Sequence, residues 1–592
     1  MAHDNGGAVI AEVLQRSGVR FLFTLCGGHI SPILVESKAR GIHVVDVRDE
    51  VAAVFAADAV ARMTGVPGVA AVTAGPGVTN TITAVKNAQM AQSPVLLFGG
   101  ATATVLKGRG SLQDIDQLSL MKPITKWATA VKTMADLGPT VERALQVAAS
   151  GVPGPVFLEV PVDLLYKEEV VRQWYMKESG VENAETLPAR ALKLYLQGHL
   201  YRQFHGPRLP ELGVPELRIP SIGEVAASFP PPRRDPAPQV REVAGLLERA
   251  ERPVLVIGSQ ALVNVTDANR IAEAVRRLGI PTFLGGTARG LLGRSSEQQF
   301  RHHRGKALKE ADLVIIAGFP FDFRLGYGRG INRKGTLISV NLSASELRKN
   351  RRPEIAVKMH AGEFLCALAE QAPPGVRRDP WMSELRRREA ERDTEITFQS
   401  TSPGELVNPL HFFLRLEDKM ADDAVLVVDG GDFVATAAYT LRPRAPLSWL
   451  DPGVFGTLGV GGGFAVGAAL VNPGREVWLI YGDGSSAYSL AEFDTCCRHG
   501  LAPIAVIGND GVWSQIAREQ VEMLGDDVGT VLRRCDYHKV AEGYGAAGLL
   551  LDNPNQIDET LDRAKALARA GTPVCINVHI ARSEFRKGSI SM

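Results

Sequence analysis

The sequence has no surplus of either charge, and this excludes one large class of partners. Its 592 residues include 66 Lys and Arg against 65 Asp and Glu, so the formal net charge is only +1. Proteins that bind nucleic acid neutralise its phosphates with an excess of basic side chains, and this chain has no such excess. We therefore expect no nucleic-acid partner.

Long apolar runs and paired cysteines are also missing. No stretch approaches the roughly 18–20 consecutive apolar residues that a membrane-spanning helix needs. The opening residues, MAHDNGGAVIAEVLQRSGV, lack the basic region and apolar core of a secretory signal. The six cysteines form no CxxC pair and no cluster with histidine, which is typical of reduced thiols. We expect a cytoplasmic protein without a membrane partner.

The chain is rich enough in apolar residues for several cores. Apolar residues make up 45% of the chain. Domains typically contain roughly 150–200 residues, so a chain of 592 residues is expected to form three or four domains. Residues 1–182 alternate strand and helix patterns. The expected strands are 21–26, 43–47, 69–73, 95–98 and 156–160, and the expected helices include 51–63 and 79–90. Apolar strands separated by helices indicate a parallel sheet covered on both faces.

The rest of the chain repeats this rhythm after an interruption. Residues 183–240 are proline-rich with poor periodicity, which predicts a linker or surface excursion. Alternation resumes in a smaller central α/β domain, 241–372. A second linker, 373–404, leads to a last domain, 405–592. The fold class we predict is α/β, with three doubly wound parallel-sheet domains.

Two neighbouring strand ends in the last domain carry oxygen ligands. The apolar run 477–481 leads into Gly482-Asp483-Gly484-Ser485, and the run 504–507 leads into Gly508-Asn509-Asp510. Ligands of open parallel sheets bind at the carboxyl ends of the strands. Mg²⁺ prefers oxygen donors and shares its shell with phosphates, which bare glycine backbone and a helix N-terminus also favour. The pattern predicts a metal–diphosphate site.

A second informative block lies in the first domain. Glu50 follows an expected strand and opens an Ala-rich helix, and Gly75-Pro76-Gly77 makes a tight turn into a helix that carries Asn80. On its own, an acidic residue in the first turn of a helix is most often a partner of the helix dipole.

Together the two blocks resemble the thiamine-diphosphate (ThDP) enzymes of the acetolactate synthase and pyruvate oxidase group. The resemblance implies that the three domains are the pyrimidine-binding, central and diphosphate-binding domains of such an enzyme. It also implies the cofactors ThDP and Mg²⁺, a small-molecule substrate, and a homodimer or homotetramer with active sites at the subunit interface.

The resemblance assigns roles to individual residues. Glu50 matches the glutamate that hydrogen-bonds N1′ of the aminopyrimidine, and a partly buried carboxyl can share a proton with a ring nitrogen. Gly456 would offer its carbonyl to the 4′-amino group, and Leu458 would be the wedge that bends the cofactor. The implied cofactor contacts are Glu50, Pro76, Asn80, Gly431, Asp432, Gly456, Leu458, Gly482, Asp483, Gly484, Ser485 and Asn509.

The metal ligands leave an alternative open. Asp483 matches the family's first ligand. Spacing places the second ligand on Asp510, whereas residue type favours Asn509. The third donor would be a backbone carbonyl, of Val512 in the first case and of Gly511 in the second.

Two segments resemble the substrate-facing residues of benzaldehyde lyases. A lone histidine after a strand is more often structural, but Gly27-Gly28-His29-Ile30 resembles the G-A-H-I of that family. Residues 111–117, SLQDIDQ, resemble its LQ-x-x-x-DQ segment with one residue fewer inside. We expect His29 to shuttle a proton to the substrate hydroxyl and Gln113 to orient the substrate.

Over nearly the whole chain, long motifs such as FTLCGGHISP and GNDGVWSQIAREQV resemble the acetolactate-synthase-like family, also described as type 2 2-hydroxyacyl-CoA lyases. This implies a C–C lyase and carboligase that converts a 2-hydroxyacyl-CoA into an aldehyde and formyl-CoA. The CoA or its ADP moiety would need a basic surface in the central domain. The candidates are Arg301, His302, His303, Arg304, Arg324, Arg329 and Arg333.

Two other reactions stay open. The first is an acetolactate synthase that condenses pyruvate, a 2-oxo acid, with FAD in the central domain, because residues 321–324, FDFR, partly match that family's flavin segment. Cys26-Gly27-Gly28-His29 replaces the usual Pro-Gly-Gly of those synthases, and Asn341 replaces their acidic residue after the last central strand, which weighs against FAD. The second is a benzaldehyde-lyase-type carboligase without CoA. A catalytically silent relative would have lost Glu50, Asp483 or the glycine turns, and all are present.

Overall fold

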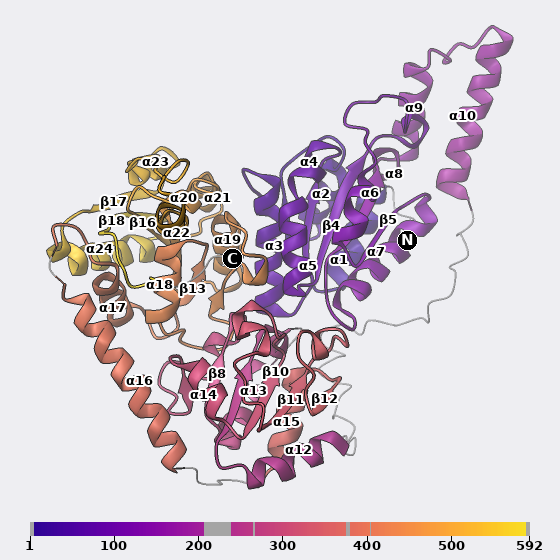
Figure 1. Ribbon diagram of the computed structural model, residues 1–592. Helices are drawn as coiled ribbons and strands as arrows, with labels where there is room; N and C mark the ends of the chain where they lie inside the picture. The colour runs from indigo at the N-terminus through magenta and orange to yellow at the C-terminus, as the bar shows by residue number, and fades with distance from the viewer. Residues whose placement is uncertain (1–4, 207–237, 264–266, 374–378, 403, 588–592) are drawn as a thin grey trace. The chain divides into compact units, whose positions relative to one another are not determined.

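The computed structural model describes residues 5–206, 238–263, 267–373, 379–402 and 404–587 (Figure 1). The chain divides into two compact units. The first contains residues 1–61 and 66–232, and the second contains residues 62–65 and 233–592. Each unit is described by itself.

The first unit is built on a six-stranded parallel sheet in the order β2-β1-β3-β4-β6-β5. Its strands are β1 (Phe21–Thr24), β2 (His43–Asp46), β3 (Gly68–Val72), β4 (Val95–Ala101), β5 (Trp127–Ala130) and β6 (Val156–Pro161). Its helices are α1 (Gly6–Arg16), α2 (Ser31–Ala39), α3 (Glu50–Thr64), α4 (Pro76–Asn80), α5 (Ile82–Ala91), α6 (Gln117–Met121), α7 (Met134–Ala149), α8 (Val162–Leu165), α9 (Glu168–Glu178) and α10 (Leu187–His205).

Two details of this unit differ from the sequence-based expectation. The helix expected over 79–90 is two helices, α4 and α5, which meet at Thr81. The Thr81 hydroxyl donates to the carbonyl of Val78 at 2.7 Å, and such local bonds compete with a continuous helix. The short edge strand β5 was not expected.

The proline-rich range 183–240 is helical in its first part. Thr186 caps α10, whose Leu196 and Leu200 pack with Val171 and Tyr175 of α9 in a small apolar cluster. The α9–α10 pair extends away from the sheet of this unit (Figure 1). Residues 207–237 lie outside the described part of the chain.

The second unit holds two further six-stranded parallel sheets. The central sheet has the order β12-β11-β10-β7-β8-β9 and the last sheet the order β14-β13-β15-β16-β18-β17. The strands are β7 (Pro253–Ile257), β8 (Thr282–Leu284), β9 (Gln299–Phe300), β10 (Leu313–Ala317), β11 (Thr336–Val340), β12 (Ile355–Val357), β13 (Val425–Val428), β14 (Trp449–Leu450), β15 (Val477–Gly482), β16 (Ile504–Asn509), β17 (Ala547–Leu551) and β18 (Val574–His579).

Helices cover both sheets of the second unit. Those of the central region are α12 (Pro238–Arg249), α13 (Ala268–Leu278), α14 (Arg304–Glu310), α15 (Ala361–Gln371) and α16 (Asp379–Ser400). Those of the last region are α17 (Pro409–Lys419), α18 (Asp432–Thr440), α19 (Val460–Val471), α20 (Asp483–Ser486), α21 (Glu492–Arg498), α22 (Ser514–Leu524), α23 (Tyr537–Gly543) and α24 (Ile557–Arg569). Helix α16 fills most of the range 373–404 and buries Trp381 and Leu385 in a central core cluster.

The three sheets confirm the predicted fold class. Their inner strands are buried along nearly their whole length, as the continuous apolar runs predicted. In each sheet the carboxyl ends of neighbouring strands share one edge, and nearly all the candidate residues follow those ends. Among the described residues, no helix combines the length and the apolar content that a membrane crossing requires.

Candidate active site

In the first unit, Glu50 lies where the sequence predicts it, at the first position of α3. Its carboxyl is 7% exposed and accepts a hydrogen bond from Nδ2 of Asn80 at 3.1 Å. A Cβ atom at Gly77 would lie 3.5 Å from Oε1 of Glu50 and 2.8 Å from Cγ2 of Thr73. The glycine turn that begins α4 therefore keeps the space beside the Glu50 carboxyl free of side chains.

His29 and Gln113 lie close together, joined by a residue that the sequence did not single out. Nδ1 of His29 is 3.2 Å from the Thr73 hydroxyl, which donates to Oε1 of Gln113 at 3.4 Å. When the Thr73 hydroxyl donates to Gln113, its oxygen can accept Nδ1–H of His29, and this tautomer leaves Nε2 as the free base. Burial lowers the pKa of His29, so the imidazole is neutral at pH 7. The sequence feature that could have indicated Thr73 is its position directly after β3, in the T-x-GPG motif.

The backbone of Gln113 is in the left-handed region, with φ of 64°. This conformation costs a non-glycine residue on the order of 1 kcal/mol and persists where the surroundings enforce it. Gly75, itself at φ of 62°, lies directly against Gln113, because a Cβ atom there would be 2.8 Å from the Gln113 carbonyl oxygen. Glycine is needed at position 75 because of its own positive φ and because a side chain there would collide with Gln113.

In the second unit, Asp429 at the end of β13 organises the glycine-rich turn before α19. Its two carboxyl oxygens accept the N–H groups of Gly459 at 3.0 Å and Gly461 at 2.7 Å. Burial raises the pKa of Asp429 to about 7, against the opposing effect of these peptide hydrogen bonds. The sequence pointed to Gly431 and Asp432 but not to this carboxyl, which lies two residues before Gly431.

The same turn positions Leu458. A Cβ atom at Gly430 would lie only 2.3 Å from Cδ2 of Leu458, so the leucine rests on bare backbone. Gly456, at φ of 65°, ends the short helical turn just before it. Leu458 is thus held against the backbone that follows β13, and its role as a wedge stays a prediction.

The ends of β13 and β15 approach each other through glycine backbone. A Cβ atom at Gly431 would lie 3.9 Å from Cα of Gly482, and one at Gly482 would lie 3.2 Å from the carbonyl oxygen of Gly430. The Ser485 hydroxyl donates to the carbonyl oxygen of Gly482 and accepts its N–H, both at 3.1 Å, which closes the turn into α20. These residues form a cradle of main-chain groups of the kind that accepts phosphate.

Asp432 begins α18, where the sequence analysis expected a cofactor contact. Its carboxylate pairs with Arg518 of α22 at 2.8 Å. The charge of Asp432 is therefore compensated within the protein.

The buried carboxyl group of Asp483 lies near the half-buried carboxyl group of Asp510. Asp483 is 4% exposed and accepts the N–H groups of Gly484 and Gly511, both at 2.8 Å. Burial, and then the charge of Asp510, raise the pKa of Asp483 to about 6. Burial also raises the pKa of Asp510. A divalent cation would relieve this repulsion, and carboxylate oxygens are the ligands that Mg²⁺ prefers.

Asn509 is engaged differently from Asp510. Its Nδ2 donates to the carbonyl of Cys535 and to Oδ1 of Asn577, both at 3.1 Å, whereas its own buried Oδ1 has no hydrogen-bond partner among the described residues. In the described parts of the chain there is no group of three or more His, Cys, Asp or Glu that could hold a metal. Any ion held by Asp483 and Asp510 must therefore take its other donors from backbone, amide or ligand oxygens.

Comparison with known proteins identifies what these sites have in common. Three sequence families match the chain: the N-terminal TPP binding domain of thiamine pyrophosphate enzymes over residues 4–120, their central domain over 240–368 and their C-terminal TPP binding domain over 429–578. The chain belongs to the thiamine pyrophosphate enzymes. The expected family is thereby confirmed, and its cofactor, thiamine pyrophosphate or ThDP, is the cofactor of this chain.

Full-length relatives narrow the family further. The 2-hydroxyacyl-CoA lyase 2 of Danio rerio is 47% identical over 99% of this chain and 93% of its own length, and that of Homo sapiens is 47% identical over 99% and 92%. The acetolactate synthase large subunit of Mycobacterium tuberculosis is 32% identical over 97% and 95%. This ThDP enzyme is thus related to both, with more identity to the lyases.

The two TPP-binding matches contain every candidate catalytic, cofactor-binding and metal-binding residue of this ThDP enzyme. The N-terminal match includes Glu50, His29 and Gln113, and the C-terminal match includes Asp429 and Asp483. The neighbouring carboxyl groups of Asp483 and Asp510 would bind a cation, and the glycine cradle would accept the diphosphate of ThDP.

The relay through Thr73 can be tested by removing one hydroxyl. Thr73→Val keeps the shape of the side chain and leaves Nδ1 of His29 without its partner. We expect turnover to fall about 10- to 100-fold while ThDP affinity is unchanged. Steady-state kinetics and calorimetric titration with ThDP measure the two quantities.

The matched control is Thr125→Val. The buried hydroxyl of Thr125 donates to the carbonyl of Met121 at 2.8 Å, away from His29. It should turn over at the wild-type rate, and a Thr73→Val enzyme equal to this control would contradict the relay.

Proposed function

We propose that this chain is a ThDP- and Mg²⁺-dependent C–C lyase and carboligase that cleaves 2-hydroxyacyl-CoA to an aldehyde and formyl-CoA. Two features support it. The first unit offers a neutral histidine relay suited to the proton of a 2-hydroxyl group. The second unit offers a basic cavity suited to the phosphates of CoA. This cavity is the observation that favours a CoA substrate.

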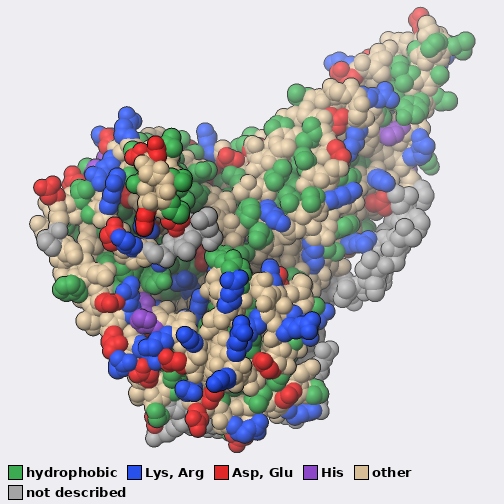
Figure 2. Space-filling model, in the orientation of Figure 1, with side chains coloured by type: hydrophobic (Ala, Val, Ile, Leu, Met, Phe, Trp, Pro, Cys, Tyr) green, Lys and Arg blue, Asp and Glu red, His purple; other side chains and the backbone are tan. Residues whose placement is uncertain are grey.

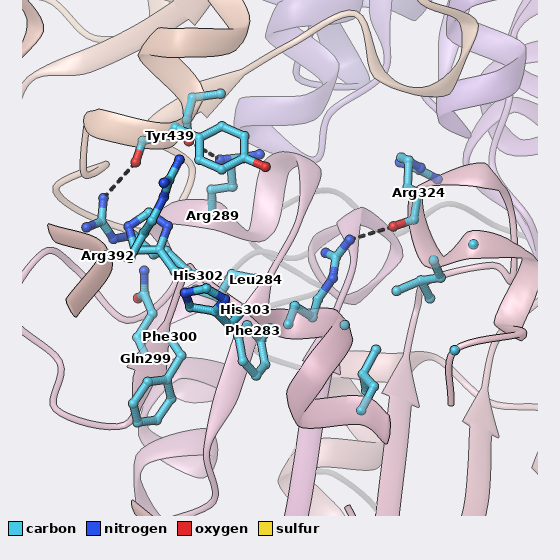
Figure 3. A pocket seen from close by; sticks show the side chains of 18 of the residues that line it. Phe283, Leu284, Arg289, Gln299, Phe300, His302, His303, Arg324, Arg392 and Tyr439 are labelled. Atoms are coloured by element: carbon cyan, nitrogen blue, oxygen red, sulfur yellow. Dashed lines mark hydrogen bonds between the residues drawn. The ribbon is translucent and has the colours of Figure 1, made fainter. Parts of the chain in front are cut away.

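The cavity has a volume of about 620 Å³ and lies beside β8, β9 and α14, with α18 at its edge. Five arginines and two histidines line it, namely Arg289, Arg301, Arg304, Arg324, Arg392, His302 and His303, and no acidic residue is among its lining side chains. Figure 3 shows Arg289, Arg392 and the two histidines around one space, with the Tyr439 ring at its border. Lys and Arg side chains also gather over this part of the second unit in the space-filling view (Figure 2).

Two of these arginines have no carboxylate partner among the described residues. Arg289 donates to the carbonyl of Ala438 at 2.8 Å and lies over the Trp449 ring, and its buried Nε has no hydrogen-bond partner. Arg304 donates to the carbonyl of Arg324 at 2.5 Å. Burial lowers the pKa of both guanidinium groups, and a bound phosphate would supply the missing counter-charge.

The remaining arginines around the cavity are already paired. Arg301 contacts Glu389 and Asp393, Arg324 contacts Asp322, and Arg392 contacts Glu395. Arg329 and Arg333, which the sequence analysis also proposed for CoA, are not among the residues that line the cavity. The ADP moiety of CoA would therefore bind chiefly through Arg289 and Arg304, with aromatic rings such as Tyr439 available to stack on adenine.

The protein's own residues would divide the chemistry among them. When bound, ThDP supplies the nucleophilic carbon and the electron sink that cleavage beside a carbonyl needs. Glu50 holds the aminopyrimidine through a shared proton. Nε2 of His29 takes the proton of the substrate 2-hydroxyl, and Gln113 hydrogen-bonds the reacting carbonyl and orients it. Leu458 would pack against the bound cofactor.

For the cation, the arrangement supports Asp510 over Asn509 as the second ligand beside Asp483. Asp510 carries a carboxylate close enough to Asp483 to raise its pKa, whereas Asn509 offers only a neutral amide oxygen, with its Nδ2 donating to Cys535 and Asn577. The carbonyl of Val512 would be the third donor by spacing, and that of Gly511 would serve only if Asn509 were a ligand. Diphosphate oxygens would complete the shell.

The Glu50 half and the Asp483 half of the site belong to different units of the chain. We propose that each active site takes one half from each of two copies, so the enzyme is a homodimer or homotetramer. A monomeric mass in solution with retained activity would contradict this assembly.

Acetolactate synthesis with FAD is the second candidate, favoured by the synthase relative. Against it, Asp322 and Arg324 of the flavin-like segment are paired with each other, and Oδ1 of Asn341 accepts from Gln260 and from the N–H of Ser343. A carboligase without CoA would leave the basic cavity without a role. Flavin absorbance of the purified protein would support the synthase.

The mechanism predicts that Glu50→Gln removes proton sharing with the cofactor and keeps the size of the side chain. We expect formation of formyl-CoA from a 2-hydroxyacyl-CoA series to fall about 100-fold or more, measured by mass spectrometry. Glu142→Gln, on the exposed face of α7, is the control and should be neutral. Full turnover of the Glu50→Gln enzyme would disprove the mechanism. Absence of formyl-CoA from the wild-type enzyme at every chain length would disprove the lyase assignment.

The cavity predicts a loss that depends on CoA. Arg304→Gln should raise KM for the CoA substrate about 10-fold or more with little change in kcat, because a remote charge contact is lost in ground and transition states alike. Ligation of aldehydes without CoA should be unaffected. The exposed Arg333 provides the control Arg333→Gln, and equal KM values for both variants would exclude the cavity as the CoA site.

The carboxyl pair predicts opposite effects of pH on stability and on metal binding. Asp483 in the folded, metal-free protein has its pKa raised to about 6, so its stabilising contribution is present at low pH and is lost as the pH rises through about 6. A cation needs the ionised carboxylate. We therefore expect the affinity for Mg²⁺ with ThDP to fall about 10-fold from about pH 7.5 to about pH 5, as measured by calorimetry. An affinity independent of pH would contradict the assignment.

A further inference from the structure

The amide of Gln117, the first residue of α6, is buried and uses all its polar atoms. It is 2% exposed, and its Oε1 accepts the N–H of Gly75 at 2.9 Å. Its Nε2 donates to the carbonyl of Gly100 at 3.1 Å and to Oε2 of Glu159 at 3.0 Å. One side chain thus ties together the segment after β3, the end of β4 and the strand β6.

Two of these partners, Gly75 and Gly100, have backbone that packs directly against the substrate-facing residues. A Cβ atom at Gly100 would lie 2.6 Å from Cβ of His29 and 3.1 Å from its carbonyl oxygen. At Gly75 a Cβ atom would lie 2.9 Å from Cβ of Gln113. Gly100 therefore supports His29, Gly75 supports Gln113, and the Gln117 amide is hydrogen-bonded to both supports.

Glu159 fixes the orientation of the Gln117 amide by accepting its Nε2–H. Its carboxylate is almost fully buried in β6, and its second oxygen, Oε1, contacts the ammonium group of Lys107. Lys107 and Gln117 flank Gln113 in the connection between β4 and α6. This connection is therefore fixed at both ends by one carboxylate, with the left-handed residue Gln113 between them.

We propose that Gln117, backed by Glu159, is a positioning residue that sets the distance between His29 and Gln113. The inference rests on the proposed function, in which these two residues face the substrate. Gln117 acts through its hydrogen bonds to Gly75 and Gly100, and a change of that spacing would misplace the proton acceptor relative to the reacting carbonyl.

The test uses the holoenzyme with Gln117→Leu, which keeps a buried side chain of similar size and removes the three hydrogen bonds. We expect kcat to fall about 100-fold, the cost of a small misplacement of reacting groups, with ThDP affinity changed less than about 3-fold. Amide hydrogen exchange should quicken in peptides spanning residues 74–80 and 107–116, with and without cofactor.

Gln203→Leu is the matched control. Gln203 of α10 is also buried, at 3% exposure, but neither of its amide atoms has a hydrogen-bond partner among the described residues. This variant should keep wild-type turnover. Equal turnover of Gln117→Leu and Gln203→Leu would overturn the proposal.

A charge swap separates positioning from a general loss of stability. Gln117→Glu places a second carboxylate against Glu159 and should lower kcat more than Gln117→Leu does. Adding Glu159→Gln restores a donor–acceptor pair between the two side chains and should recover kcat at least about 10-fold, because contacting residues are not additive. No recovery in the double variant would overturn the coupling.

A last measurement distinguishes positioning from loss of the cofactor site. Exchange of the thiazolium C2 proton of bound ThDP depends on the Glu50 half, so it should stay within about 2-fold of wild type in Gln117→Leu. A parallel loss of C2 exchange and kcat would mean a structural role and overturn the proposal. Each variant is also compared with wild type in aldehyde ligation without CoA. If wild type ligates aldehydes but gives no formyl-CoA, the lyase assignment fails while this comparison still decides the role of Gln117.

Discussion

The site in the second unit depends on one interaction, the acceptance of glycine N–H groups by buried carboxyl groups at strand ends. Asp429 binds the N–H groups of Gly459 and Gly461, and Asp483 binds those of Gly484 and Gly511. Because the strands are parallel, these carboxyls lie along one edge of the sheet. The glycines are needed because a side chain would occupy the cradle, as the contact of Gly430 with Leu458 illustrates. The shape of the glycine turn, the position of Leu458 and the approach of Asp510 to Asp483 all follow from this arrangement.

The arrangement has a cost in stability. Burial raises the pKa of Asp429 to about 7 and that of Asp483 to about 6, so the folded protein without cofactor holds carboxyl groups in an environment that disfavours their charge. Arg289 and Arg304 are in the corresponding situation for a positive charge, because burial lowers the pKa of both guanidinium groups. A cation bound near the aspartates and phosphate groups bound near the arginines would stabilise the protein, because they bind only its folded state. Substrate and cofactor sites are therefore places where folding leaves electrostatic free energy unsatisfied.

Residues next to strand ends were predictable from the sequence, and residues that join distant segments were not. Periodicity placed the sheets, and the motifs placed Glu50 and Asp483 at the ends of their strands. Thr73 and Gln117 could not be assigned in the same way, because their roles consist of hydrogen bonds to residues 17 to 44 positions away in the sequence. The ambiguity between Asn509 and Asp510 is of the same kind. The orientation of the Asn509 amide depends on a bond to Asn577, 68 residues further along the chain.

The chemistry is divided between neutral groups and charged groups in a way that favours a CoA thioester. The first unit gathers His29, Thr73 and Gln113, which are uncharged at pH 7 or made so by burial, and such groups suit proton exchange with a hydroxyl. The second unit gathers guanidinium groups around a cavity without acidic lining. A pyruvate molecule has its one negative charge beside the reacting carbonyl, where a basic histidine relay gives no specific partner. A CoA thioester is uncharged at the reacting bond and anionic far from it, so remote binding free energy can be used to hold the substrate for the chemical step.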